Sequence, residues 1–130
     1  LPIWEGNDGT VIVTGGILCE VQKAADELAS RGIRIRILSC HSLKPFDHDA
    51  LVQAAVETGG IVTVEEHTID GGLGSLVSES LMDRGILPKY FLRIGLEAGF
   101  SSIVGSQEYL RAMYQMDSNA IRDRIAKLLC

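Results

Sequence analysis

The sequence predicts an α/β domain in which helices cover both faces of a mostly parallel sheet. Short runs of β-branched residues alternate with stretches whose apolar residues recur at helical spacing, in the order β-α-β-α-β-α-β-α-α. Alternation of this kind gives parallel strands joined by right-handed crossovers. The 130 residues are also enough for one domain with a hydrophobic core.

The first half of the chain contributes two strands and two helices. Residues 11–14 are a β-branched strand that runs into a glycine turn, and residues 17–30 carry a helical apolar stripe. Residues 33–37 alternate isoleucine and arginine, which is the period of a strand. The next helix is capped by Asp47 or Asp49 and ends before a glycine pair. Residues 1–9 are expected to be a linker from a preceding domain, with the folded domain at residues 10–130.

The second half repeats the alternation and ends in two helices. Ile61, Val62 and Val64 form a third strand. A helix at residues 74–82 stops before a glycine, and a fourth strand follows. The remaining predicted elements are that strand at residues 90–94 and helices at residues 107–114 and 118–129.

Composition and charge exclude several classes of function. The net charge is −5 and no basic stripe is visible, so neither nucleic acid nor an anionic membrane surface is an expected partner. No apolar run approaches the roughly 20 residues of a membrane helix. Three cysteines without CxxC or metal spacing predict reduced thiols in a cytoplasmic protein.

The most informative stretch, IVTVEEHTIDGGLGSLVSES at residues 61–80, runs from a strand through a glycine turn into a helix. In open α/β sheets, ligands and partners gather at such carboxyl ends of strands. Glu65 and Glu66 are neighbours on a strand and point to opposite faces, so we do not expect a paired acid/base couple. One of them is expected to face the helix layer or cap a backbone group, and the other to face the loop.

Several polar features allow a chemical and a structural interpretation. The glycines of the turn could cradle a phosphate at the helix start, or could allow close packing. His67 could carry a proton, or could bind an interface by hydrogen bonds. Arg34 and Arg36 could bind an anion, although a solvated sheet margin is favoured, and His48 is expected at a solvated helix start. Spacing alone yields no complete catalytic set and no metal site.

Four segments carry a resemblance to a known enzyme family. They are TVIVTGG at residues 10–16, LKPFD at 43–47, VEEHTIDGGLG at 64–74 and RIGLEAGF at 93–100. In this order and at these intervals, they resemble the C-terminal domain of the transketolase family of thiamine diphosphate enzymes. The resemblance implies a three-layer αβα fold with about five strands, mostly parallel and one antiparallel.

The resemblance also implies what surrounds this domain. Family members are homodimers, or dimers of split subunits. Thiamine diphosphate and its Mg²⁺ lie between a pyrophosphate-binding and a pyrimidine-binding domain, both absent from this chain. No catalytic, cofactor-binding or metal-binding residue is therefore expected here. The resemblance places Glu66, His67, Gly71 and Gly72 at the border of the active site or at an interface.

The implied function is transfer of a two-carbon ketol unit between sugar phosphates by the whole enzyme. The domain would contribute to assembly and to the active-site border, and would be inert alone. Alternatives are the same domain in a deoxyxylulose phosphate synthase or in the beta subunit of a 2-oxo acid dehydrogenase. A stand-alone interaction module with this fold is a further alternative.

Overall fold

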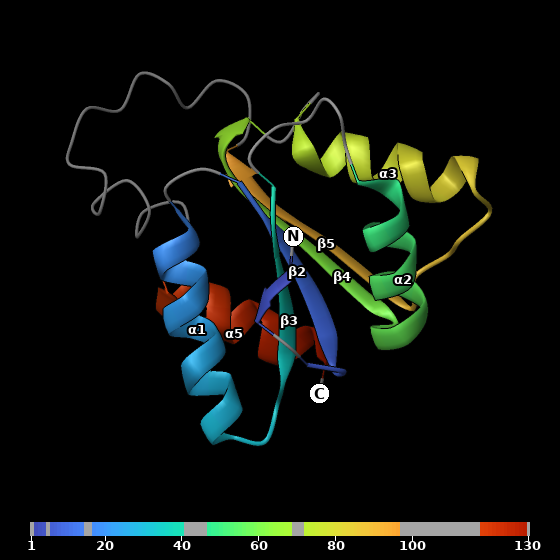
Figure 1. Ribbon diagram of the computed structural model, residues 1–130. Coiled ribbons are helices and arrows are strands. Elements are labelled where there is room, and N and C mark those ends of the chain that lie inside the picture. The colour runs from blue at the N-terminus through green and yellow to red at the C-terminus, as the bar shows by residue number, and fades with distance from the viewer. Residues whose placement is uncertain are drawn as a thin grey trace.

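The computed structural model describes residues 2–4, 6–14, 17–40, 47–68, 72–96 and 118–129 (Figure 1). Within these residues five strands form one sheet, and four helices lie against it. The strands are β1 (Pro2–Trp4), β2 (Gly9–Val13), β3 (Ile35–Ser39), β4 (Gly60–Thr68) and β5 (Tyr90–Leu96). The helices are α1 (Leu18–Ser30), α2 (His48–Thr58), α3 (Leu73–Asp83) and α5 (Ser118–Leu129).

The sheet has the order β1-β3-β2-β4-β5 and is parallel except for β1. The expected α/β fold, with about five strands of which one is antiparallel, is therefore confirmed. The antiparallel strand is Pro2–Trp4, which pairs with Leu38 and Ile37 of β3. This part of the segment expected to be a linker belongs to the sheet. Three residues are too few for strand periodicity to be visible in the sequence.

Helices cover both faces of the sheet and divide the core in two (Figure 1). One face packs on α1 and α5, because alternate residues of the strands point to it. The other face packs on α2 and α3. The side chains on the first face include Val11, Val13, Ile37, Val62, Val64, Ile94, Ile121 and Ile125, and those on the second include Ile12, Leu38, Leu51, Ile61, Leu73, Val77 and Leu81.

Most element boundaries agree with the sequence to within a few residues, and the largest difference is in β4. The sequence predicted a strand over residues 61–64, whereas β4 continues to Thr68. Its backbone stays paired with β5 as far as Thr68 and Leu96, beyond an irregularity in register. Consecutive polar residues hide this extension, because they show no period of two. The predicted helix at residues 107–114 lies outside the described residues.

The connections of the sheet create a switch point between β2 and β4. From β2 the chain crosses to β3 on one side through α1, and from β3 it returns to β4 on the other side through α2. These two helices cover opposite faces. The carboxyl ends of β2 and β4 are adjacent, since the Thr14 N–H donates to the Val64 carbonyl at 3.2 Å. Ligands of open α/β sheets bind outside this kind of point.

No helix among the described residues is both long and apolar enough to cross a bilayer.

Candidate functional site

The predicted border residues lie at the carboxyl end of β4 and the start of α3. Glu66 and His67 are in the last part of β4, and Gly72 is the residue that precedes the first turn of α3. Gly72 has φ −96°, so its backbone conformation is open to any residue. Gly71 lies outside the described residues. Glu66, His67 and Gly72 are thus next to the switch point between β2 and β4.

Glu65 caps helix α3 from the end of β4. Its side chain is only 3% exposed, and its two carboxylate oxygens accept hydrogen bonds from the backbone N–H groups of Leu73 at 3.1 Å and Gly74 at 2.9 Å. Charge-assisted bonds of this kind, together with the helix dipole, offset the burial of a carboxylate. The prediction that one of the two adjacent acids caps a backbone group is confirmed for Glu65.

This cap decides between the two interpretations of the start of α3. A phosphate at a helix N-terminus binds the free N–H groups of the first turn. Here the amides of Leu73 and Gly74 already donate to the Glu65 carboxylate. A bound phosphate would also stand beside that buried negative charge. The phosphate interpretation is therefore wrong for these two amides.

Gly74 allows α3 to lie directly on the sheet. A Cβ built at this position would be 2.6 Å from Nε of Arg93 and 3.1 Å from Oγ1 of Thr63. Thr63 and Arg93 are register partners on β4 and β5. The guanidinium of Arg93 also donates to Oγ of Ser75 in the first turn of α3, at 3.1 Å. Close packing, the second interpretation of the glycine turn, is confirmed for Gly74.

Sequence reasoning missed Arg93 as a contact of the helix start. One signal was available, because Arg93 lies two residues after Phe91 and so shares its face of β5. A charged residue in register with apolar residues of a strand indicates a polar contact under a helix.

His48 is the first residue of α2 and is partly exposed, as expected, and it also takes part in a contact between helices. Its Nδ1 is 2.6 Å from Oγ of Ser80, which also accepts from the Arg84 guanidinium at 3.2 Å. Ser80 is 3% exposed, so this serine has little access to a substrate, whereas His48 is partly exposed. The described residues contain no group of three side chains that could hold a metal ion. His41 lies outside the described residues.

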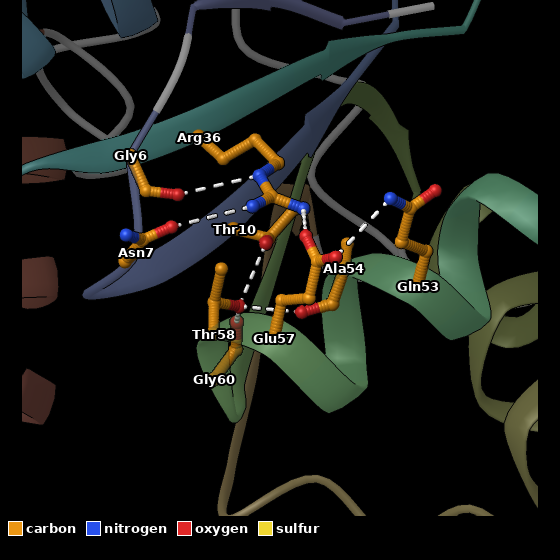
Figure 2. A network of polar contacts seen from close by, with 9 residues as sticks. All are labelled: Gly6, Asn7, Thr10, Arg36, Gln53, Ala54, Glu57, Thr58 and Gly60. Carbon is orange, nitrogen blue, oxygen red and sulfur yellow. Dashed lines mark hydrogen bonds and ion pairs between the residues drawn. The ribbon is translucent and has the colours of Figure 1, made fainter.

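Arg36 is buried and is part of a polar network whose partners Asn7 and Glu57 are exposed (Figure 2). Its side chain bonds Glu57 on α2 at 2.8 Å, and it donates to the Gly6 carbonyl at 3.3 Å and to Oδ1 of Asn7 at 3.4 Å. Arg36 is 9% exposed, whereas Arg34 is exposed as expected. The amide of Gln53 and then the guanidinium of Arg36 donate to Glu57 and hold the pKa of its carboxyl below the ordinary value.

The Arg36 network lies at the amino edge of the sheet, away from the border residues. Thr10 and Thr58 extend it through a hydrogen bond of 2.8 Å between their hydroxyl groups (Figure 2). An apolar hollow of about 230 Å³ also lies away from them, at the far end of α3. The hollow is lined by Ser78, Leu81, Met82, Ile86, Leu87, Pro88 and Phe91. Neither feature contributes to the carboxyl edge where Glu65 caps α3.

The family model described as "Transketolase, C-terminal domain" matches residues 3–121. The 6-deoxy-6-sulfo-D-fructose transketolase subunit SqwH of Clostridium sp. (strain MSTE9) is 37% identical over 117 residues, covering 90% of this chain and 35% of that protein. The 1-deoxy-D-xylulose-5-phosphate synthase of Thermomicrobium roseum is 38% identical over 125 residues, covering 96% and 20%.

A solved structure agrees with these relatives. A split gene transketolase, described as an inactive beta4 tetramer, superposes with a TM-score of 0.86 at 32% identity, covering 97% of this chain and 40% of that one. The chain spans about a fifth to two fifths of the length of the curated relatives it matches.

Proposed function

The chain belongs to the family of transketolase C-terminal domains, and from this premise we propose that it serves an enzyme transferring two-carbon ketol units between sugar phosphates. The observation that carries the proposal is the family match over residues 3–121, together with relatives named as transketolase subunits. In ketol transfer the C2–C3 bond of a donor ketose breaks, and the donor leaves as an aldose two carbons shorter. The acceptor aldehyde gains a carbon–carbon bond, with no net oxidation.

A synthase of deoxyxylulose phosphate is the second candidate, because sequence identity does not separate the two. The relatives named as synthases reach 39% identity, against 37% for the transketolase subunit SqwH. Both kinds of relative carry this domain within a longer chain, since the match covers 35% and 38% of two transketolase subunits, 40% of a split gene transketolase and 18–20% of the first three synthases.

Within such an enzyme, this domain contributes to assembly and to the border of the active site, and is inert alone. The border is formed by Glu66, His67, Gly71 and Gly72. Support comes from the position of Glu66, His67 and Gly72 at the carboxyl edge of the sheet, beside the switch point. The enzyme is a cytoplasmic homodimer, or a dimer of split subunits, and the pyrimidine-binding domain precedes this domain or belongs to the other subunit.

The described residues of this chain do not fit thiamine diphosphate or its metal. They contain no group of three metal-ligating side chains, and Glu65 occupies the first amides of α3 that a diphosphate would need. The cofactor and Mg²⁺ are assigned to the other domains.

The test is an activity assay on the complete enzyme that carries this chain, purified with its thiamine-binding domains or subunit. With a ketose phosphate as donor and an aldose phosphate as acceptor, we expect a product ketose two carbons longer than the acceptor. Release of CO₂ from a 2-oxo acid, without ketol transfer, would instead support the synthase. A purified native chain of this length with no thiamine-binding partner would support a stand-alone interaction module.

A further inference from the structure

We propose that Glu65 is a positioning residue, which fixes the end of β4 and the first turn of α3 relative to each other, on either side of the segment formed by residues 66–72. The inference rests on the proposed function, because that function gives the segment its role at the border of the active site. Glu65 itself, at 3% exposure, touches backbone groups and not the solvent side. It therefore acts through the residues that follow it.

The cap bridges the connection between β4 and α3. Glu65 precedes the segment, and the two N–H groups that it binds, those of Leu73 and Gly74, follow it. One side chain thus joins both ends of the connection between β4 and α3. All four border residues, Glu66, His67, Gly71 and Gly72, lie between these fixed points.

Both ends of the connection are themselves held by contacts with β5. The β4 end is part of the ladder with β5, in which Val64 pairs with Ile94. The α3 end is held on the sheet, because Gly74 leaves no room for a Cβ beside Arg93, and Arg93 donates to Ser75 at 3.1 Å. The carboxylate therefore connects two elements that are each held on the sheet.

A carboxylate at position 65 satisfies both donors, the N–H groups of Leu73 and Gly74. Glutamate offers two acceptor oxygens, and each accepts one of the two N–H groups. Glutamine has the same shape but offers one oxygen and an NH₂ group, which would face a second donor. Glu65→Gln is therefore a nearly isosteric substitution. It removes one of the two hydrogen bonds and places the NH₂ donor of glutamine against a backbone N–H donor at the start of α3.

The experiment compares the complete wild-type enzyme with Glu65→Gln and with Ile125→Val. Ile125 is fully buried in the core between α1 and α5, so its truncation lowers stability without touching the cap. Hydrogen exchange is measured at the backbone amides of residues 66–74, and kcat and KM are measured for ketol transfer. We expect Glu65→Gln to speed exchange in this segment alone and to lower kcat/KM by roughly 10- to 100-fold. Ile125→Val should leave kcat/KM unchanged even where its Tm falls as much as that of Glu65→Gln.

Each result has a defined meaning. Unchanged exchange at residues 66–74 in Glu65→Gln, or faster exchange with unchanged kcat/KM, would overturn the positioning role. An equal loss of kcat/KM in both variants would also overturn it, since the loss would then follow stability. If the wild-type enzyme shows no ketol transfer, the proposed function fails, while the exchange result still tests whether Glu65 holds the segment. Should Glu65→Gln not fold, Glu65→Asp, which keeps the charge on a shorter side chain, must show the same two effects.

Discussion

Nε of Arg93 leaves no room for a side chain at position 74, because it would be 2.6 Å from a Cβ built on Gly74. The relation brings β5 and the first turn of α3 closer than any other residue at position 74 would permit. It also explains why a glycine, normally unfavourable inside a helix, lies in the second position of α3. The loss of helix propensity is offset by direct contact with the sheet.

Gly74→Ala should therefore destabilise the domain although alanine favours helices. Alanine gains up to about 1 kcal/mol in propensity, but overpacking in a rigid site typically costs about 1–3 kcal/mol. We expect a net loss in the free energy of unfolding, measured by urea denaturation. Glu79→Ala, on the exposed side of the same helix, should change it by less than about 0.5 kcal/mol. A Gly74→Ala variant as stable as wild type would show that Arg93 moves aside freely.

Glu57 should make stability depend on pH in the acid range. Gln53 and Arg36 hold the pKa of the Glu57 carboxyl below its ordinary value of 4.5. The unfolded chain then binds the proton more readily, so the contribution of Glu57 is fully present above that value and is lost as the pH falls through the folded pKa. We expect Glu57→Gln to be less stable than wild type at pH 7, with the difference shrinking on acidification. A difference that grows toward low pH would contradict this assignment.

Glu20 is a second carboxylate that caps a distant helix. Its Oε2 accepts from the backbone N–H of Ser118 at 2.7 Å, and so joins the first turns of α1 and α5. Glu20→Ala should cost about 0.5–2 kcal/mol, the usual effect of losing a helix cap. Thermal unfolding would measure it. Lys23→Ala is the matched control, because it removes only the surface partner of Glu20 at 3.5 Å, and its Tm should stay close to wild type.

His67→Ala tests the border of the active site in the complete enzyme. His67 lies near the carboxyl end of β4, next to the switch point, where substrates and partner subunits are expected. We expect a lower rate of ketol transfer or weaker dimerisation. Steady-state kinetics measures the first, and sedimentation measures the second. Unchanged turnover together with unchanged assembly would remove His67 from the proposed border.

The fold could be predicted from the sequence because its core elements are strongly periodic. Ile33, Ile35 and Ile37 show the period of a strand, and Ile121, Ile125 and Leu128 show the period of a helix. The polar contacts could not be predicted in this way. Arg36 and Arg93 share a face of the sheet with apolar residues, and their partners come from distant parts of the chain.

For the candidate site, the sequence predicted the location and one interaction. It indicated that one of two adjacent glutamates would cap a backbone group, and Glu65 does so. It could not tell which glutamate, because the phase of the strand relative to the helix layer is set by tertiary packing. The roles of Glu66, His67, Gly71 and Gly72 stay predictions.

The short strand β1 affects where this domain can be separated from the rest of its enzyme. A version that begins at residue 10, where the sequence alone suggests the folded part starts, would lose the partner of β3 on its outer side. The uncovered backbone of β3 would then be free to pair with other chains, and Arg36 would lose two of its acceptors. We therefore expect recombinant versions that keep residues 2–9 to remain monodisperse, and those that lack them to aggregate.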